Sequence, residues 1–196
     1  MRKHLIVSAI AIVSLSSVAV PASADGHGKD EGHTRRVRLL DNCDPATFDL
    51  AIRPGTCIPH GDDETVTFAE FLAKLNPTDL GHDEWENNPD EVDLKSGDQI
   101  SVTVRGGEFH TFTEVPVTDG LQPGCIKELN EPLGLTGPAP TAAQCFGPTG
   151  FFKTTGVLPN GGSTLTVSGL SEGTHLFMCE IHPWMRTVVT VEGDHH

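Results

Sequence analysis

From about residue 90 onward, apolar and polar residues alternate in short segments, and glycine-rich turns separate these segments. Successive side chains of a β-strand point to opposite faces, so a period of two predicts strands with one buried face. Turn signals such as Gly106-Gly107 and Asn160-Gly161-Gly162 fit this interpretation. Many short strands joined by such turns are typical of an all-β sandwich. The alternating segments are residues 92–94, 99–104, 109–115, 163–170, 174–179 and 186–192.

The N-terminus has the organisation of a secretory signal peptide. Arg2 and Lys3 precede an apolar stretch over residues 5–20, and Ala22-Ser23-Ala24 provides a cleavage site. We therefore expect residues 1–24 to be removed and the protein to be periplasmic or extracellular. An uncleaved anchor is the alternative, and no later stretch is apolar enough to span a bilayer.

After the signal peptide, residues 25–64 predict an extension that precedes the β-domain. Residues 25–40 are polar and glycine-rich, which is typical of a flexible arm. Residues 41–64 are rich in Asp, Pro and Gly and contain two cysteines, which predicts an irregular loop stapled by a disulfide.

The predicted β-domain spans residues 65–192 and begins with a short helix over residues 67–75. Thr67 and Glu70 have the spacing of a capping box, and the helix ends at Asn76-Pro77. A Pro- and Gly-rich loop insertion lies within this domain at about 118–160, and a tail follows the domain at 193–196.

The chain has five cysteines, and export places them in an oxidising compartment where they pair. An odd number leaves one cysteine free or available for chemistry. Cys179 is set apart because it stands beside a histidine and a methionine. Proximity in sequence predicts the disulfides Cys43–Cys57 and Cys125–Cys145, although four cysteines also allow two other pairings.

Cys179, His182 and Met185 have the spacing C-x2-H-x2-M in a short loop between two predicted strands. A copper electron-transfer site uses two imidazoles, one thiolate and a weak axial thioether. The second imidazole has to come from elsewhere, and His110 is the best candidate because it starts a β-patterned segment. The other histidines lie in tails or polar loops, except His175, which lies too far along the strand from the loop.

Three alternatives to copper remain open at this point. Cys179 could be a free buried cysteine beside a core methionine and a loop histidine. Zinc is a second alternative, although a thioether is a poor zinc ligand. Nucleophilic Cys–His catalysis is the third, but Met185 has no role in it.

The sequences GGEFHTFT (106–113) and FMCEIHPWMRTVVTVE (177–192) resemble those of the cupredoxins, the blue (type 1) copper proteins. The short loop, with proline after its histidine, is most similar to the amicyanin loop, and plastocyanin-like loops are longer between His and Met. The resemblance covers roughly residues 85–192. It implies an eight-stranded Greek-key sandwich that binds one copper ion. It further implies His110, Cys179 and His182 as equatorial ligands and Met185 as the axial ligand.

Residues next to these candidates suggest how the thiolate is tuned. Pro183 has no N–H to donate to the Cys179 sulfur, whereas the backbone N–H of Thr111 could donate to it. Trp184 either packs over the site or forms, with Pro183 and Met185, an exposed patch around His182 where a partner docks; we favour the patch.

A second copper site is a hypothesis for the mature N-terminus, Asp25-Gly26-His27. Its amine, amide and imidazole nitrogens suit square-planar Cu(II). A histidine-bearing tail without a metal is the simpler interpretation.

The formal charge of −14 becomes more negative when Arg2 and Lys3 are removed with the signal peptide. This charge argues against nucleic-acid binding and is compatible with a basic redox protein partner. The sequence thus predicts a monomeric, non-enzymatic carrier of single electrons that binds no organic substrate. A copper-binding or copper-delivery protein is the alternative, and a copper oxidoreductase ranks last.

Overall fold

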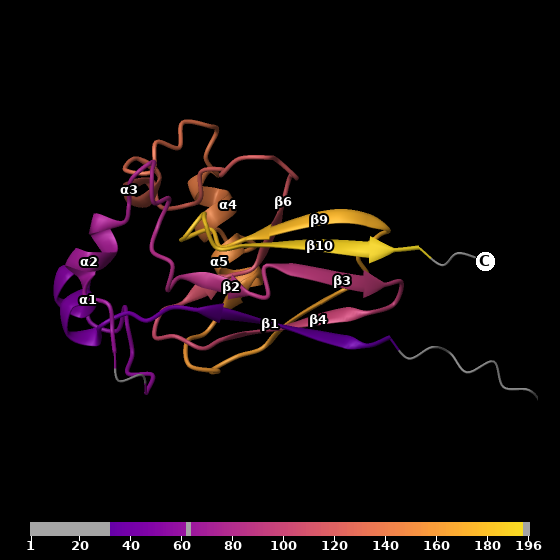
Figure 1. Cartoon of the computed structure of the whole chain (residues 1–196), viewed down its shortest axis with the longest axis horizontal. Helices are drawn as coiled ribbons and strands as arrows, with labels where there is room; N and C mark the ends of the chain where they lie inside the picture. Colours follow the sequence, from indigo (N-terminus) through magenta and orange to yellow (C-terminus); the bar gives the residue numbers. More distant parts are fainter. Residues whose placement is uncertain (1–31, 62–63, 194–196) are drawn as a thin grey trace, which may run out of the picture.

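A computed structural model describes residues 32–61 and 64–193 of the chain (Figure 1). The predicted fold class is confirmed, because two four-stranded sheets form a Greek-key β-sandwich. The first sheet has the order β2-β1-β4-β8, with the strands Glu86–Asn88, Thr34–Leu40, Gln99–Val104 and Leu165–Ser168. The second sheet has the order β3-β10-β9-β6, with the strands Glu91–Lys95, Arg186–Glu192, Gly173–Met178 and Thr113–Val115.

Alternation of apolar residues builds the core between the two sheets. In β4, Ile100, Val102 and Val104 are fully buried, and the residues between them are partly exposed. In β10, Val189 and Val191 are buried at alternate positions in the same way. Because each strand turns one face inward, the pattern fixes which face of each sheet meets the other.

A short pair of strands, β5 (His110–Thr111) and β7 (Gly156–Val157), connects the sandwich to its insertion. His110 pairs with Val157 in this ladder, and Phe112 lies just beyond it. Phe112 stacks on Phe177 of β9 with ring centroids 4.5 Å apart. This packing holds the His110 segment against β9, the strand that directly precedes Cys179.

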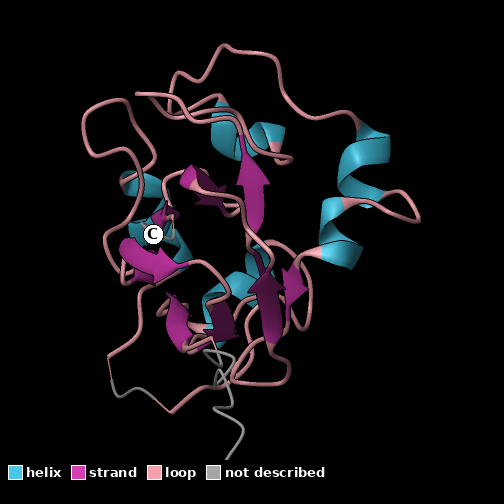
Figure 2. Ribbon diagram, turned by 90° about the vertical axis from the view of Figure 1, so that its right-hand side faces the viewer, coloured by secondary structure: helices cyan, strands magenta, loops and turns pink. Residues whose placement is uncertain are grey.

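Two helices, α1 (Pro45–Ala51) and α2 (Phe68–Ala73), lie together at one end of the molecule (Figure 1). Asp44 caps α1 by accepting the Thr47 N–H, and α1 begins with proline, whose missing N–H costs nothing at a helix start. The predicted capping box of Thr67 and Glu70 is present at the start of α2. Figure 2 shows the molecule turned by 90°, with short helices and long loops around the strands.

The insertion at 118–160 contains three short helices as well as loop. They are α3 (Lys127–Asn130), α4 (Ala142–Phe146) and α5 (Phe151–Thr154). Both predicted disulfides are present: Cys125–Cys145 ties α4 to the start of the insertion, and Cys43–Cys57 closes the segment that contains α1. Cys179 is free and buried, as cysteine parity predicted.

Two expectations about the N-terminal extension are wrong. The flexible arm predicted over residues 25–40 includes β1, which lies between β2 and β4 in the first sheet. Val37 and Leu39 are fully buried, and the neighbouring arginines are exposed. The high charge of this segment led to the prediction of a polar arm, although the segment is a strand with one apolar face. The stapled loop predicted over 41–64 contains α1, whose Phe48 is also fully buried.

Part of the sequence-based interpretation falls outside the described residues. The signal peptide at 1–24 and the Asp25-Gly26-His27 motif are among these positions. Within residues 32–61 and 64–193, we find no helix that combines the length and the apolarity needed to cross a membrane.

Candidate metal centre

The loop from Cys179 to Met185 joins the end of β9 to the start of β10. Its backbone closes on itself, because the Cys179 N–H donates to the Met185 carbonyl at 3.0 Å and the Met185 N–H donates to the His182 carbonyl at 2.9 Å. Cys179 and Met185 are fully buried, and His182 is only 2% exposed. A tight loop of this kind holds its three chemically active side chains in fixed directions.

The structure brings His110 together with Cys179 and His182, which lie about 70 residues later in the sequence. The Cys179 sulfur lies 3.6 Å from Nδ1 of His110 and 3.9 Å from Nδ1 of His182. One candidate ligand atom from each residue lies within 4.8 Å of the other two. His110 is fully buried, so the three groups form a compact and nearly solvent-free cluster.

Thr111 contributes to this cluster as the sequence suggested. Its backbone N–H donates to the Cys179 sulfur at 3.4 Å. Its hydroxyl oxygen accepts the Glu180 N–H at 2.8 Å, which ties the loop to the strand that carries His110. Thr111 therefore contacts both the sulfur and the loop that carries it.

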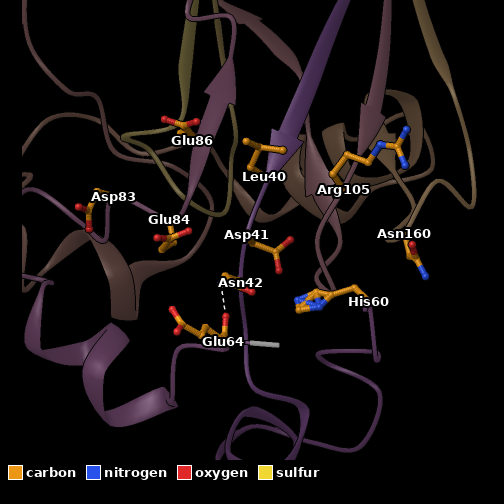
Figure 3. Close-up of a pocket in the computed structure, with 10 residues that line it drawn as sticks. All are labelled: Leu40, Asp41, Asn42, His60, Glu64, Asp83, Glu84, Glu86, Arg105 and Asn160. Carbon is orange, nitrogen blue, oxygen red and sulfur yellow. Dashed lines mark hydrogen bonds between the residues drawn. The ribbon is translucent and has the colours of Figure 1, made fainter. Parts of the chain in front are cut away.

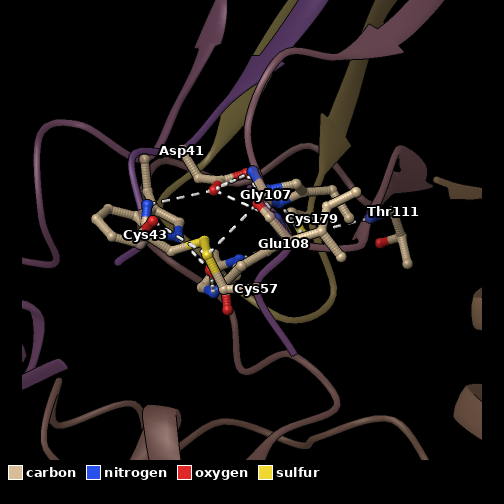
Figure 4. Close-up of polar contacts among 11 residues, drawn as sticks. Asp41, Cys43, Cys57, Gly107, Glu108, Thr111 and Cys179 are labelled. Atoms are coloured by element: carbon tan, nitrogen blue, oxygen red, sulfur yellow. Dashed lines mark hydrogen bonds and ion pairs between the residues drawn. A yellow bond between two sulfur atoms is a disulfide. The ribbon is translucent and has the colours of Figure 1, made fainter. Parts of the chain in front are cut away.

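A buried carboxylate, Asp41, holds the outer nitrogen of His110. Figure 4 shows Asp41 with its neighbours Gly107 and Glu108. Its Oδ2 lies 2.8 Å from His110 Nε2, and its Oδ1 accepts the Gly107 N–H at 2.8 Å. A Cβ at Gly106 would collide with this carboxylate, so only glycine permits the close approach. Burial alone would raise the pKa of Asp41, but the bonds from His110, Gly107 and Glu108 hold it below its ordinary value.

A second carboxylate, Glu108, lies beside His182. Its Oε2 is 3.6 Å from His182 Nε2 and accepts the indole N–H of Trp85 at 2.6 Å. Glu108 is 6% exposed, and burial raises its pKa even though the charge of His182 opposes the rise. Both histidines thus have a carboxylate behind the nitrogen that does not face Cys179, an arrangement that orients metal-binding imidazoles.

The sequence-based search missed Asp41 and Glu108. One signal could have found Glu108, because it lies two residues before His110 and alternation places both on the same strand face. Asp41 gave no comparable signal, since it lies 69 residues before His110 in a segment predicted to be loop.

The expectation of an exposed patch around His182 is wrong. Pro183 is buried, and Trp184 is only partly exposed. Trp184 donates its indole N–H to the His82 carbonyl at 3.2 Å, and its ring packs on Gly81, where a Cβ would overlap it. Phe71 from α2 lies 6.0 Å from the His182 ring, so the N-terminal helices cover the histidine that the sequence placed at the surface.

The charges of the cluster favour a thiolate. Burial opposes ionisation of Cys179, but hydrogen bonds and charges of His110 and His182 lower its pKa well below the ordinary value. Burial likewise opposes the charged form of His110, yet Asp41 and Cys179 raise its pKa to about 10. A pre-formed thiolate next to two oriented imidazoles fits a soft cation, and the donor set matches that expected of type 1 copper.

On the far side of Asp41, an open hollow is lined mainly by polar residues (Figure 3). Glu64, Glu84 and Glu86 face this hollow, with Arg105 on the opposite side. His60 also lines it, with Nε2 buried and lacking a hydrogen-bond partner. The surface near the cluster is therefore strongly acidic, in agreement with the overall charge.

No family model and no curated protein sequence matches the chain. Solved structures that it is similar to include a purple cupredoxin from Nitrosopumilus maritimus, at 15% identity over 60% of this chain and 95% of that one, with a TM-score of 0.36. An oxidised plastocyanin from Dryopteris crassirhizoma is 14% identical over 81% of this chain and 100% of its own, with a TM-score of 0.37. A pseudoazurin from Methylobacterium extorquens AM1 is 18% identical over 83% and 77% of the two chains, with a TM-score of 0.35. All three TM-scores are below 0.5, and the fold described above rests on the strand order and sheet packing of this chain.

Proposed function

We propose that this protein is an exported type 1 copper protein that carries single electrons between redox partners. His110, Cys179 and His182 would hold the metal, and Met185 would offer its thioether as a weaker donor. The observation that carries this proposal is the buried Cys179 sulfur between two imidazole Nδ1 atoms, at 3.6 and 3.9 Å. Copper bound there would supply a one-electron couple between Cu(I) and Cu(II).

The surroundings of the cluster suit electron transfer because they resist rearrangement. The loop is closed by backbone hydrogen bonds, and Asp41 fixes the His110 ring from behind. Ligands that keep their positions in both oxidation states lower the reorganisation that accompanies each transfer. The residues of this chain therefore contribute a rigid, water-poor frame.

Copper delivery, the alternative function, is favoured less by the same geometry. A delivery protein has to release its metal to another molecule. Here Cys179 and Met185 are fully buried, and His182 is 2% exposed beneath Phe71. Release from such a site requires the cover to move.

The partner we propose is a basic redox protein that meets a monomer of this chain. Trp184 lies 5.3 Å from the His182 ring and lines an open groove. Asp79, Asp83 and Glu86 line the same groove, so its rim is acidic. A cationic surface would be attracted to this rim and would bring its own redox group close to Trp184.

Copper titration tests the proposal directly. Cu(II) is added to the metal-free mature chain while visible absorption is recorded, and the loaded protein is then titrated reductively. We expect an intense blue thiolate-to-copper band that saturates at one equivalent. Cys179→Ser should abolish the band, whereas Met185→Leu should keep it and shift the potential. Absence of an intense band from the unmodified protein would contradict the proposal.

A further inference from the structure

A cavity of about 680 Å³ lies on the His182 side of the cluster. The helices α1 and α2 form one wall, and α3 with Phe152 of α5 forms the other. Its volume falls in the range of about 300–1,000 Å³ that is typical of sites for small organic molecules. Five phenylalanine rings line it: Phe48, Phe68, Phe71, Phe109 and Phe152.

One polar group in this apolar cavity has an unused hydrogen-bonding atom. Glu108 is 6% exposed and lines the cavity, and its Oε2 is occupied by the Trp85 indole N–H. We find no hydrogen bond to its Oε1 from any residue in the described part of the chain. Oε1 is also not one of the side-chain atoms that are fully buried and lack a hydrogen-bond partner. Glu108 therefore brings an unoccupied hydrogen-bond acceptor to the lining of the cavity.

We propose that this cavity binds a small neutral phenol, meaning a single aromatic ring that carries a hydroxyl group. The ring would pack among the phenylalanine side chains in offset or edge-on contacts. The hydroxyl would donate to Oε1 of Glu108, because a carboxyl oxygen accepts a hydrogen bond. The carboxylates of Glu108 and Glu128 line the cavity and disfavour an anionic ligand.

The near-complete burial of Glu108 and His182 limits how a ligand reaches them. A folded protein surface cannot enter the cavity, whereas a single ring can. The inference goes beyond the sequence-based expectation that the protein binds no organic substrate. It concerns binding alone, includes no reaction, and does not depend on the bound metal.

The test uses phenol and the metal-free mature chain in a two-dimensional ¹H–¹⁵N NMR titration. The chain has two tryptophans, so it gives two indole N–H signals. The Trp85 indole donates to the carboxylate that the phenol would share, so its signal should shift on binding. The Trp184 indole donates to the His82 carbonyl and serves as an internal reference.

Two matched variants locate the binding site. Ala51→Trp places a large ring in the cavity that Ala51 lines and should abolish the Trp85 shift. Leu50→Trp adds the same ring one position earlier on α1, at a residue that is 89% exposed and outside the cavity, and should leave binding intact. Circular dichroism checks the fold, and Leu72→Trp, which fills the cavity from α2, replaces Ala51→Trp if the latter does not fold.

Anisole tests the hydrogen bond, because it keeps the ring and replaces the hydroxyl hydrogen with a methyl group. We expect anisole to bind about tenfold more weakly than phenol or worse. The proposal is overturned if the Trp85 signal does not move, if the folded cavity-filling variant still binds phenol, or if anisole binds as tightly as phenol.

Discussion

His110 and His182 present the same atom to Cys179 but have different environments behind them. Behind His110, Asp41 lies 2.8 Å from Nε2 and also accepts backbone N–H groups. Behind His182, Glu108 lies 3.6 Å from Nε2 and accepts one indole N–H beside a cavity. The pKa of Asp41 is lowered, whereas burial raises the pKa of Glu108. The two halves of the site therefore differ, since Asp41 is a charge-paired support for His110, whereas Glu108 is a buried carboxyl group between His182 and a cavity.

The largest expected difference between the halves is in stability. Asp41→Ala leaves His110 and the Gly107 N–H without their acceptor, and we expect a loss of about 3–5 kcal/mol in the free energy of unfolding. Glu108→Ala removes a carboxylate that is costly to bury, which offsets the lost Trp85 hydrogen bond, so we expect a loss of about 1 kcal/mol or less. Urea unfolding of both metal-free variants at pH 7 measures the difference. Equal losses would mean that the two carboxylates are equivalent.

Removal of the cover over His182 should affect metal retention. Phe71→Ala opens the space beside the His182 ring, so a chelator should remove copper at least about tenfold faster. The same substitution should lower the free energy of unfolding by about 3–5 kcal/mol, because Phe71 is buried. Ile100→Ala creates a similar defect in the core of the first sheet and serves as the control. Copper loss should be unchanged in that variant. Equal acceleration in both variants would show that general loosening, rather than the cover, sets the rate.

Glu180 supplies a third buried carboxylate for comparison with Asp41 and Glu108. Burial, together with the neighbouring thiolate, raises its pKa to about 7. Because the folded-state pKa lies above the unfolded value of 4.5, stability falls as the pH rises from about 4.5 to 7. Glu180→Gln should therefore be more stable than the unmodified protein by about 1–3 kcal/mol at pH 8, with no gain below pH 4. A constant difference at all pH values, measured by urea unfolding, would point to another cause.

The smallest expected effect concerns the thiolate itself. The Thr111 N–H donates to the Cys179 sulfur from the His110 strand, whereas Pro183, next to His182, has no N–H. Pro183→Ala should provide a second donor and raise the reduction potential of the copper-loaded protein by on the order of 50 mV, the equivalent of a hydrogen bond of about 1 kcal/mol. Voltammetry measures this change, and a lower potential would count against it.

The sequence predicted the parts of this molecule that local rules govern. Alternation identified the strands of the sandwich from β3 onward, and the Thr67–Glu70 spacing identified the start of α2. The loop motif and His110 pointed to the cluster because the residue types carry the chemistry themselves. Cysteine proximity gave both disulfides.

The parts that the sequence did not predict depend on contacts between distant segments. The exposed arginines of β1 made the segment look polar, so its two buried residues, Val37 and Leu39, were not recognised as part of a strand. The support of His110 by Asp41 and the cover of His182 by Phe71 exist only after the segment between β1 and β2 packs on the sandwich. Burial of Pro183 and Trp184 follows from the same packing, which is why an exposed patch was expected there.

X-ray absorption spectroscopy at the copper edge tests the central claim most directly. The copper-loaded mature chain should give a short sulfur scatterer and two imidazole nitrogen scatterers. In Cys179→Ser the sulfur contribution should disappear, and in His110→Ala and His182→Ala one imidazole contribution should be lost in each case. A spectrum of the unmodified protein with nitrogen and oxygen scatterers alone would contradict the claim that His110, Cys179 and His182 hold the metal.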